Sequence, residues 1–200
     1  MIKKGDIRAM LRPLYHSIRN PAPRGLKSMG RDSVFFRPCR IDGARYISIG
    51  DHTHIFRHGW LSAVEFWAGV HYQPRIVIGN NVHIGGNVWI TCISQVVIED
   101  GCVLGERVYI SDAAHGLDPE LGPIMEQKLV SKGNVLIQEN TFIGYGACIQ
   151  PGVTLGKHCI VGTNSVVTHS FPEYSMVAGV PARLIKTYSH EKKGWISVSD

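Results

Sequence analysis

Branched apolar residues recur every six positions along most of this chain. A period of six fits neither an amphipathic helix, whose apolar stripe repeats about every 3.6 residues, nor a half-buried strand, which alternates every two. It fits a solenoid with three short β faces per turn, in which each coil buries its apolar side against its neighbours, so the pattern predicts a parallel β-helix. The anchors are Ile49, Ile55 and Leu61; Ile78, Ile84 and Ile90; Ile98, Leu104 and Ile110; and Ile137, Ile143, Ile149, Leu155, Val161 and Val167, with a weaker first register at Phe35, Ile41 and Ile47.

Two further positions keep the same spacing. The residue two places before an anchor is small or β-branched and is expected to point inward: Val82, Val88, Cys102, Val108, Ala147, Val153, Cys159 and Ser165. The residue before that one is of a type that tolerates a left-handed backbone and is expected in a turn: Asn81, Asn87, Gly101, Asn140, Gly146, Gly152, His158 and Asn164. A β-sandwich of short strands is the alternative, but it would not hold three linked positions at one spacing.

Two coils are longer than the repeat requires. The distance from Ile137 to Leu155 is 18 residues, whereas Ile49 to Ile78 spans 29 and Ile98 to Ile137 spans 39. Both excess segments follow the third hexad of their coil, so they are expected to leave the solenoid at one corner, one coil apart. Long insertions in a minimal repeat are where function usually lies. The first insertion carries Glu65, Phe66, Trp67 and His71, and the second carries His115, Asp118 and Glu120.

The limits of the six-residue pattern predict one all-β domain with short appendages. We expect an N-terminal helix and arm over residues 1–33, a β-helix over 34–180 with loops near 62–75 and 113–134, and a C-terminal cap and tail over 181–200. A hydrophobic content of 44% in 200 residues is enough for a real core. No stretch approaches the roughly 18 apolar residues of a membrane span and no secretory signal is recognisable, so a cytoplasmic protein is expected.

Charge and cysteine content narrow the function classes. The net charge of +5 suits an anionic ligand, but no nucleic-acid motif accompanies it, and no nucleic-acid partner is expected. The five cysteines form no CxxC pair, and an odd number argues against a disulfide framework. Cys102 and Cys159 occupy the small inward position, so they are interpreted as core residues.

The chain resembles the hexapeptide-repeat acyltransferases over about residues 34 to 188. The resemblance rests on Tyr109-Ile-Ser-Asp-Ala-Ala-His115, on Ile143-Gly-Tyr-Gly through Gly162-Thr-Asn-Ser-Val-Val-Thr168, and on Ala178-Gly-Val-Pro-Ala-Arg-Leu-Ile-Lys186. Within that family it looks most similar to the sugar and polysaccharide O-acetyltransferases, which share the Tyr46-Ile-Ser-Ile-Gly-Asp51 opening. The resemblance implies a left-handed β-helix, a homotrimer with active sites between subunits, and acetyl-CoA as the acyl donor. No metal is expected.

His115 is the predicted catalytic residue. An alcohol needs a base to remove its proton as it attacks a thioester, and imidazole titrates near neutrality and suits that task. His115 opens the longest insertion and matches the histidine that does this work in the family, although a solvated loop histidine is the plainer alternative. The resemblance implies an oxyanion donor among the backbone N–H groups around Tyr145 or Gly146. Asp112 could orient His115 or could simply serve the turn.

The resemblance also implies where the donor binds. It places the pantetheine arm in a groove between two subunits, with the phosphates of CoA near basic residues of the C-terminal signature. The implied donor residues are Tyr145, Gly162, Thr163, Thr168, His169, Arg183 and Lys186.

The acceptor is predicted only by residue type. Tryptophan faces beside polar groups can hold a sugar ring, although each tryptophan could equally pack in the structure. The predicted acceptor residues are Glu65 and Trp67 in the first insertion, and Asn87 and Trp89 in the following coil. The expected reaction is acetyl transfer to a hydroxyl of a sugar or of a surface-polysaccharide precursor, directly and without an acyl-enzyme.

Three other functions are compatible with a β-helix. Acetylation of an amine on an amino sugar or small molecule, and a non-catalytic β-helix scaffold, both remain open. The γ-class carbonic anhydrases share the fold but bind zinc through histidines, two of them separated by four residues, and no histidine pair in this chain has that spacing.

Overall fold

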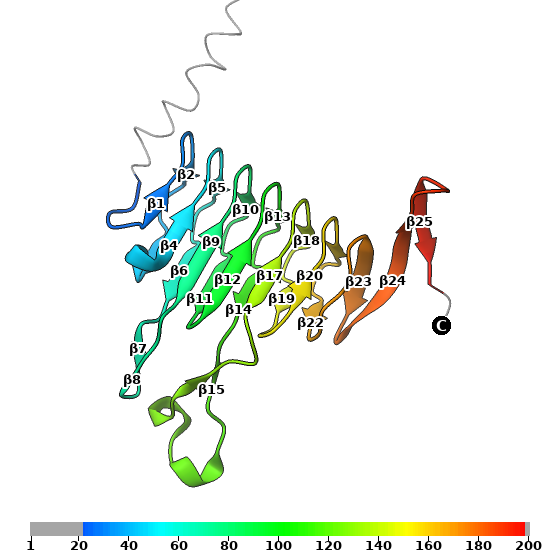
Figure 1. Ribbon diagram of the computed structural model, residues 1–200. Coiled ribbons are helices and arrows are strands. Elements are labelled where there is room, and N and C mark those ends of the chain that lie inside the picture. The colour runs from blue at the N-terminus through cyan, green and yellow to red at the C-terminus, as the bar shows by residue number, and fades with distance from the viewer. Residues whose placement is uncertain (1–21, 199–200) are drawn as a thin grey trace, which may run out of the picture.

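The chain winds into a stack of coils along one axis, and three sheets form the sides of a prism (Figure 1). A computed structural model describes residues 22–198. The first sheet contains, in spatial order, β1 (Ser28–Met29), β4 (Ile47–Ile49), β9 (Arg75–Ile78), β12 (Gln95–Ile98), β17 (Val135–Ile137) and β20 (Thr154–Leu155). The second contains β2 (Val34–Phe35), β5 (His54–Ile55), β10 (His83–Ile84), β13 (Val103–Leu104), β18 (Phe142–Ile143), β21 (Ile160–Val161), β23 (Ser175–Gly179), β24 (Ala182–Ser189) and β25 (Gly194–Ser197). The third contains β22 (Val166–Val167), β19 (Cys148–Ile149), β14 (Tyr109–Ser111), β11 (Trp89–Cys92), β6 (Trp60–Ala63) and β3 (Arg40–Asp42).

The six-residue pattern forms the core, as predicted. Strands of successive coils pair in parallel with their anchors in register, and one ladder runs through Ile49, Ile78, Ile98, Ile137 and Leu155. Every anchor of the regular blocks is at most 3% exposed. Burying a branched apolar side chain stabilises the fold by about 1.5–3 kcal/mol. Because each anchor is covered by the coils above and below, this stabilisation requires the stack.

The predicted turn positions also have the expected backbone. All eight have positive φ angles, from 55° at Asn81 to 84° at Gly152. The small inward residues beside them are buried, which confirms that Cys102 and Cys159 belong to the core. A larger residue at the inward position would have no space between the sheets at the corner of a coil.

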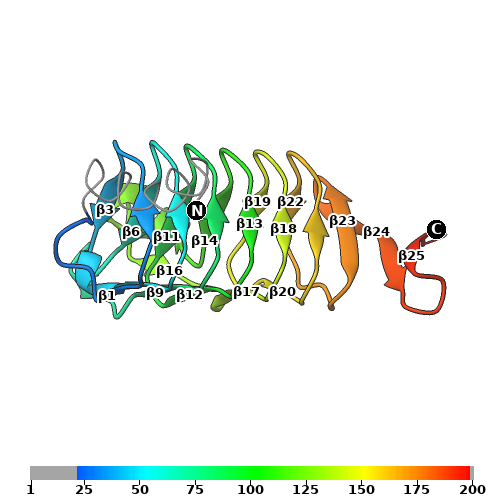
Figure 2. The ribbon, with the colours of Figure 1, turned by 90° about the horizontal axis from the view of Figure 1, so that it is seen from above.

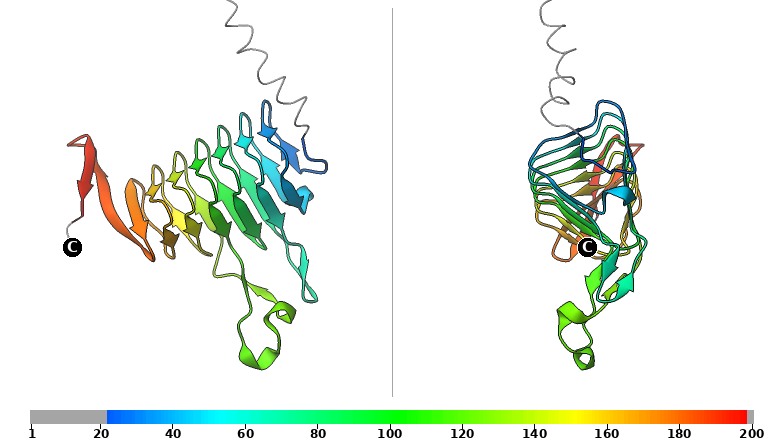
Figure 3. Two further views of the ribbon diagram at one scale, coloured as in Figure 1. Left: turned by 180° about the vertical axis from the view of Figure 1, so that it is seen from behind. Right: turned by 90° about the vertical axis from the view of Figure 1, so that its left-hand side faces the viewer.

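Both insertions leave the same corner of the prism, between the third and the first sheet, which we call the third corner. The first insertion follows β6 and forms the hairpin of β7 (Phe66–Trp67) and β8 (Val70–His71). The second follows β14 and contains β15 (Ala114–His115), the 3-10 turns η2 (Pro119–Leu121) and η3 (Ile124–Glu126), and β16 (Leu129–Val130). A single strand of the third sheet, β11, separates β6 from β14. Viewed along the axis, the two insertions project side by side (Figure 3).

The two ends of the solenoid differ. At the N-terminal end, β1 pairs with β4, so pairing begins inside the segment expected to be an arm, and the 3-10 turn η1 (Ala44–Tyr46) follows β3. The helix expected near the N-terminus lies outside the described residues. At the other end β24 and β25 continue the second sheet as antiparallel strands beyond the last coil (Figure 2). Within residues 22–198 no helix is long and apolar enough to cross a membrane.

Candidate active site

The two insertions contact each other at the third corner. The indole Nε1 of Trp67 donates a hydrogen bond of 3.1 Å to the carbonyl oxygen of Gln127. Tyr72, which follows the first hairpin, is bonded through its hydroxyl to the backbone of Leu129 in the second. Residues that are about 60 positions apart in the sequence are therefore joined in one assembly above the third corner.

His115 lies at the centre of this assembly. It is paired with Leu129 across the β15–β16 hairpin, and the next residue, Gly116, donates its N–H to the carbonyl oxygen of Lys128 at 3.1 Å. The ring of Trp67 stands edge-on to the imidazole at a centroid distance of 5.4 Å. The Nδ1 atom of His115 is buried and has no hydrogen-bond partner among residues 22–198. Nε2 is therefore the ring nitrogen left to meet a ligand.

A cavity of about 610 Å³ opens beside His115. Apolar side chains of the second insertion form much of its wall, together with two lysines, and the neighbouring coils add Gln150, Pro151 and Thr168. The complete lining is Ala114, His115, Gly116, Leu117, Asp118, Leu121, Gln127, Lys128, Val130, Lys132, Gln150, Pro151 and Thr168. A histidine, two cations and an apolar wall around one space suit an anionic or polar ligand with an apolar arm.

Asp112 has a different role from the predicted orientation of His115. Its carboxylate is fully buried and accepts backbone hydrogen bonds from Ile93, Ser94 and Gln95, at 2.8, 2.8 and 2.6 Å. These N–H groups belong to the corner of the preceding coil, where the chain turns from β11 to β12. Both oxygens are used in this way, and within the described residues no hydrogen bond joins Asp112 to His115, so the contacts of Asp112 are those of a turn residue.

Gly146 is also engaged elsewhere. It has a φ of 66° at the corner between the second and the third sheet, the second corner, and its N–H donates to the carbonyl oxygen of Glu106 at 2.9 Å. This bond holds two coils together, so the Gly146 N–H is not available to an oxyanion without breaking the stack. Of the two N–H groups considered, that of Tyr145 is the one that remains a candidate.

The predicted donor residues are divided between two corners. Tyr145, Gly162 and Thr163 lie at the second corner, in the turns that lead to β19 and β22. Thr168 and His169 lie at the third corner, directly after β22, and Thr168 lines the His115 cavity. A single subunit therefore does not bring all of these residues to one cleft.

The basic pair of the predicted donor site lies on β24. Arg183 pairs with Ala178 and Lys186 with Met176 in the antiparallel sheet beyond the last coil. Neither side chain forms an ion pair with a residue in the described part of the chain. Arg183 donates only a local hydrogen bond, to the carbonyl oxygen of Ala182 at 3.1 Å.

Of the predicted acceptor residues, only Trp67 contacts His115. Glu65 is bound by the guanidinium of Arg45 and by the hydroxyl of Tyr46, and these hydrogen bonds hold the pKa of its carboxyl below the usual value. Glu65 thus fastens the base of the first insertion to the solenoid. Neither Glu65 nor the remaining pair, Asn87 and Trp89, lines the cavity.

Trp89 belongs to an aromatic ladder on the outer face of the third sheet. Its ring stacks on that of Trp60 at 4.4 Å with the planes 10° apart, and Tyr109 meets it edge-on. The guanidinium of Arg40 covers the ring of Trp60 at 4.1 Å. Trp89 and Trp60 thus pack against their neighbours, which is the alternative to holding a sugar ring.

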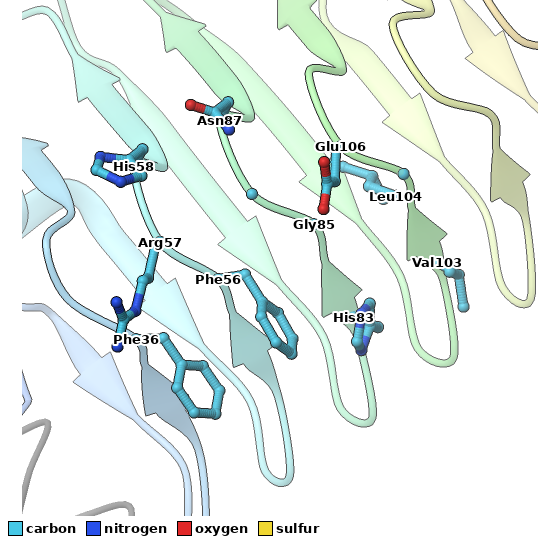
Figure 4. Close-up of a pocket in the computed structure, with 12 residues that line it drawn as sticks. Phe36, Phe56, Arg57, His58, His83, Gly85, Asn87, Val103, Leu104 and Glu106 are labelled. Atoms are coloured by element: carbon cyan, nitrogen blue, oxygen red, sulfur yellow. The ribbon is translucent and has the colours of Figure 1, made fainter.

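Asn87 lines a second cavity, of about 550 Å³, on the outer face of the second sheet (Figure 4). Phe36 and Phe56 stack there at 4.7 Å, and the ring of His83 lies 4.7 Å from that of Phe56. This cavity is at the second corner, away from His115. Asn87 and His115 therefore lie at different corners of the same subunit.

Several residues of the assembly had no signal in the sequence. Tyr72 and Gln127 lie outside the repeat, and no motif distinguishes them from other polar loop residues. Lys128 and Lys132 could have been suggested, because they lie in the second insertion with His115. Within residues 22–198 no group of three or more His, Cys, Asp or Glu side chains is placed to hold a metal ion, and the five cysteines are free thiols.

Comparison with known proteins agrees with the fold. The family model of the bacterial transferase hexapeptide (six repeats) matches residues 134–169. The chain is 32% identical over 168 residues to the putative lipopolysaccharide biosynthesis O-acetyl transferase WbbJ of Escherichia coli strain K12, covering 81% of this chain and 86% of that protein. A stack of hexapeptide coils with a histidine at an inserted loop thus defines a β-helical transferase.

Two solved structures share the fold. AntD, an N-acyltransferase from Bacillus cereus in complex with dTDP and 3-hydroxybutyryl-CoA, has a TM-score of 0.69 at 23% identity, covering 84% of this chain and 86% of AntD. The hexapeptide-repeat acetyltransferase VCA0836 from Vibrio cholerae, complexed with acetyl-CoA, has a TM-score of 0.58 at 21% identity, covering 92% and 90%. The chain belongs to the hexapeptide-repeat acyltransferase family, and it is an acyltransferase with the left-handed β-helix of that family.

Proposed function

We propose that the protein transfers an acetyl group from acetyl-CoA to a hydroxyl of a sugar or of a surface-polysaccharide precursor. The observation that carries the proposal is the cavity beside His115, which brings a histidine base together with two lysines and Thr168. The relative WbbJ supports oxygen as the accepting atom through its name, and VCA0836 supports acetyl-CoA as the donor. The proposal includes the cytoplasmic location expected from the sequence.

The proposed reaction needs one base and no covalent enzyme intermediate. His115 Nε2 takes the proton of the acceptor hydroxyl as the oxygen attacks the thioester carbonyl. The resulting oxyanion accepts a hydrogen bond from a backbone N–H, for which Tyr145 is the candidate. When the tetrahedral intermediate collapses, the C–S bond breaks and the protonated imidazole returns the proton to the sulfur of CoA. His115 is then neutral again, and the products are an acetyl ester and free CoA.

We further propose that the active enzyme is a homotrimer with its sites between subunits. Tyr145 and Thr163 lie at the second corner of a subunit, whereas His115 and Thr168 lie at the third. In a cyclic trimer the second corner of one subunit can face the third corner of the next, and three equivalent clefts result. Each cleft would then hold the complete set of donor residues, with Arg183 and Lys186 near the phosphates of CoA.

Acetylation of an amine is the second candidate function. AntD, which shares the fold, is an N-acyltransferase, and a cavity with a histidine base serves either acceptor. The two differ in what the base must do, because a neutral amine attacks without prior deprotonation. If the acceptor is an amino sugar, we therefore expect a smaller loss of rate in His115→Ala.

The test is release of free CoA from acetyl-CoA across a panel of sugars and amino sugars. We expect turnover with a hydroxyl acceptor, and a loss of about 10² to 10⁴ in rate for His115→Ala, which is the usual contribution of a general base. His190→Ala is the matched control, because His190 packs on Tyr174 and Tyr188 away from the cavity. Equal turnover in the parent protein and His115→Ala would show that His115 is not the base.

A further inference from the structure

One tyrosine hydroxyl satisfies both polar backbone groups of a single residue in the catalytic hairpin. The N–H of Leu129 donates to the hydroxyl of Tyr72 at 2.8 Å, and that hydroxyl donates to the carbonyl oxygen of Leu129 at 3.2 Å. The two residues are 57 positions apart in the sequence and belong to different insertions. In the two-stranded hairpin, β15 pairs with one edge of β16, and the Tyr72 hydroxyl bonds to the backbone at the other edge.

Leu129 is the residue that pairs with His115. The hairpin consists of two residues per strand, with Ala114 opposite Val130 and His115 opposite Leu129. An isolated two-stranded hairpin is marginally stable at best in water. The position of the His115 backbone therefore depends on what holds β16, and the Tyr72 hydroxyl holds it at the residue directly across from His115.

The imidazole ring has no hydrogen-bond partner at Nδ1 within the described chain. This Nδ1 atom is buried, and the carboxylate of Asp112 accepts its hydrogen bonds from the preceding coil. A histidine base is commonly oriented by a hydrogen bond to its second nitrogen. Here the orientation has to come from the strand that carries His115 and from the edge-on contact with Trp67.

We propose that Tyr72 is a positioning residue for His115, which acts through Leu129 and aligns the imidazole with the acceptor hydroxyl. The inference rests on the proposed function of His115. Tyr72 does not line the cavity beside His115. Trp67 has a secondary part, because it bonds to Gln127, two residues before β16, and packs against the imidazole.

Tyr72→Phe is the direct test, since it removes the hydroxyl and keeps the ring. We expect kcat to fall by about 10-fold to 100-fold, the order of loss produced by a misplacement of about 1 Å, while KM for acetyl-CoA stays within about twofold. Tyr174→Phe is the matched control, because Tyr174 packs on His158 in the last coil, and it should retain the parental kcat. An unchanged kcat in Tyr72→Phe would overturn the proposal.

A double-mutant comparison separates positioning from a general structural effect. If Tyr72 acts only through His115, Tyr72→Phe should lower kcat in the parent and have no further effect in His115→Ala. An equal loss in both backgrounds would overturn the proposal. Trp67→Phe supplies a second variant, which removes the hydrogen bond to Gln127 and keeps a ring beside His115. Trp67→Phe should lower kcat as much as Tyr72→Phe does, and its KM for acetyl-CoA should not rise.

The outcomes distinguish this inference from the proposed function. If His115→Ala turns over as fast as the parent, the function proposed for His115 fails, and the inference fails with it. If His115→Ala is inactive and Tyr72→Phe keeps the parental kcat, only the inference fails. A lower kcat in Tyr72→Phe that depends on His115 supports both.

Discussion

The indole ring of Trp67 stands edge-on to the imidazole ring of His115, with centroids 5.4 Å apart and planes inclined by 67°. The two residues come from insertions that leave the solenoid after β6 and after β14, two coils apart and not one as the sequence suggested. Their contact means that neither insertion can move without affecting the other. The first insertion, which the sequence suggested as an acceptor-binding element, therefore also packs against His115, the proposed base.

The buried carboxylate of Asp112 should matter for stability and not for catalysis. Asp112→Ala leaves the N–H groups of Ile93, Ser94 and Gln95 without their acceptor, and we expect a loss of about 3 kcal/mol in the free energy of unfolding. Urea denaturation measures this loss, and kcat is compared at a temperature where both proteins are folded. A large fall in kcat with unchanged stability would instead indicate that Asp112 orients His115.

The division of the site between two corners predicts complementation between inactive variants. His115→Ala lacks the base, and Thr163→Trp should block the donor groove at the second corner. If each site uses His115 from one subunit and Thr163 from its neighbour, every trimer that contains both variants has one working site of three and should recover about a third of the parental activity. Coexpression with different affinity tags isolates the mixed trimers. If these are no more active than either variant alone, the site lies within one subunit.

The cysteines should be unreactive in the folded protein. Burial raises the pKa of Cys102 to about 11, and it raises the pKa of Cys92, Cys148 and Cys159 above the ordinary thiol value. A thiol reagent at pH 8 should therefore label the buried cysteines only after unfolding. The double change Cys148→Ser and Cys159→Ser should retain the parental kcat, because the proposed transfer is direct and uses no cysteine. Loss of activity with a folded protein would favour a covalent thioester.

Asp51 should contribute to stability above about pH 4 and lose that contribution in acid. The backbone N–H and the guanidinium of Arg31 hydrogen-bond to its carboxylate and hold its pKa below the usual value of 3.8. A group whose pKa is lowered by folding stabilises the folded state while it is ionised, and protonation removes this effect. The melting temperature of Asp51→Asn should therefore fall less between pH 5 and pH 3 than that of the parent.

Asp32→Asn is the control for that measurement. It removes a charge from the turn between β1 and β2, one coil away from the turn that carries Asp51, and leaves both hydrogen bonds of Asp51 in place. Its melting temperature should follow the parental dependence on pH. If the melting temperatures of Asp51→Asn and the parent fall equally between pH 5 and pH 3, carboxylates other than Asp51 control unfolding in acid.

The sequence singled out residues of the His115 cavity where an insertion or a motif marks them, and it gave no such sign for the other residues of the cavity. His115 could be singled out because it opens an insertion, and Thr168 because it matches a motif, and both line the cavity. The Asp112 carboxylate and the Gly146 N–H, which the sequence suggested for the site, instead bond to the backbone of another coil. Such contacts join residues in different coils, and the sequence holds no local sign of which polar group is already bonded.

The sequence by itself determined the solenoid, because each anchor must be buried on the coil above and below, and this requirement repeats at a fixed spacing. It also determined where the chain leaves the stack. Only the tertiary structure decided that Tyr72 binds Leu129 and that Trp67 meets His115. These contacts form between two loops that are outside the repeat, and their geometry follows from the corner at which both loops leave and not from any spacing along the chain.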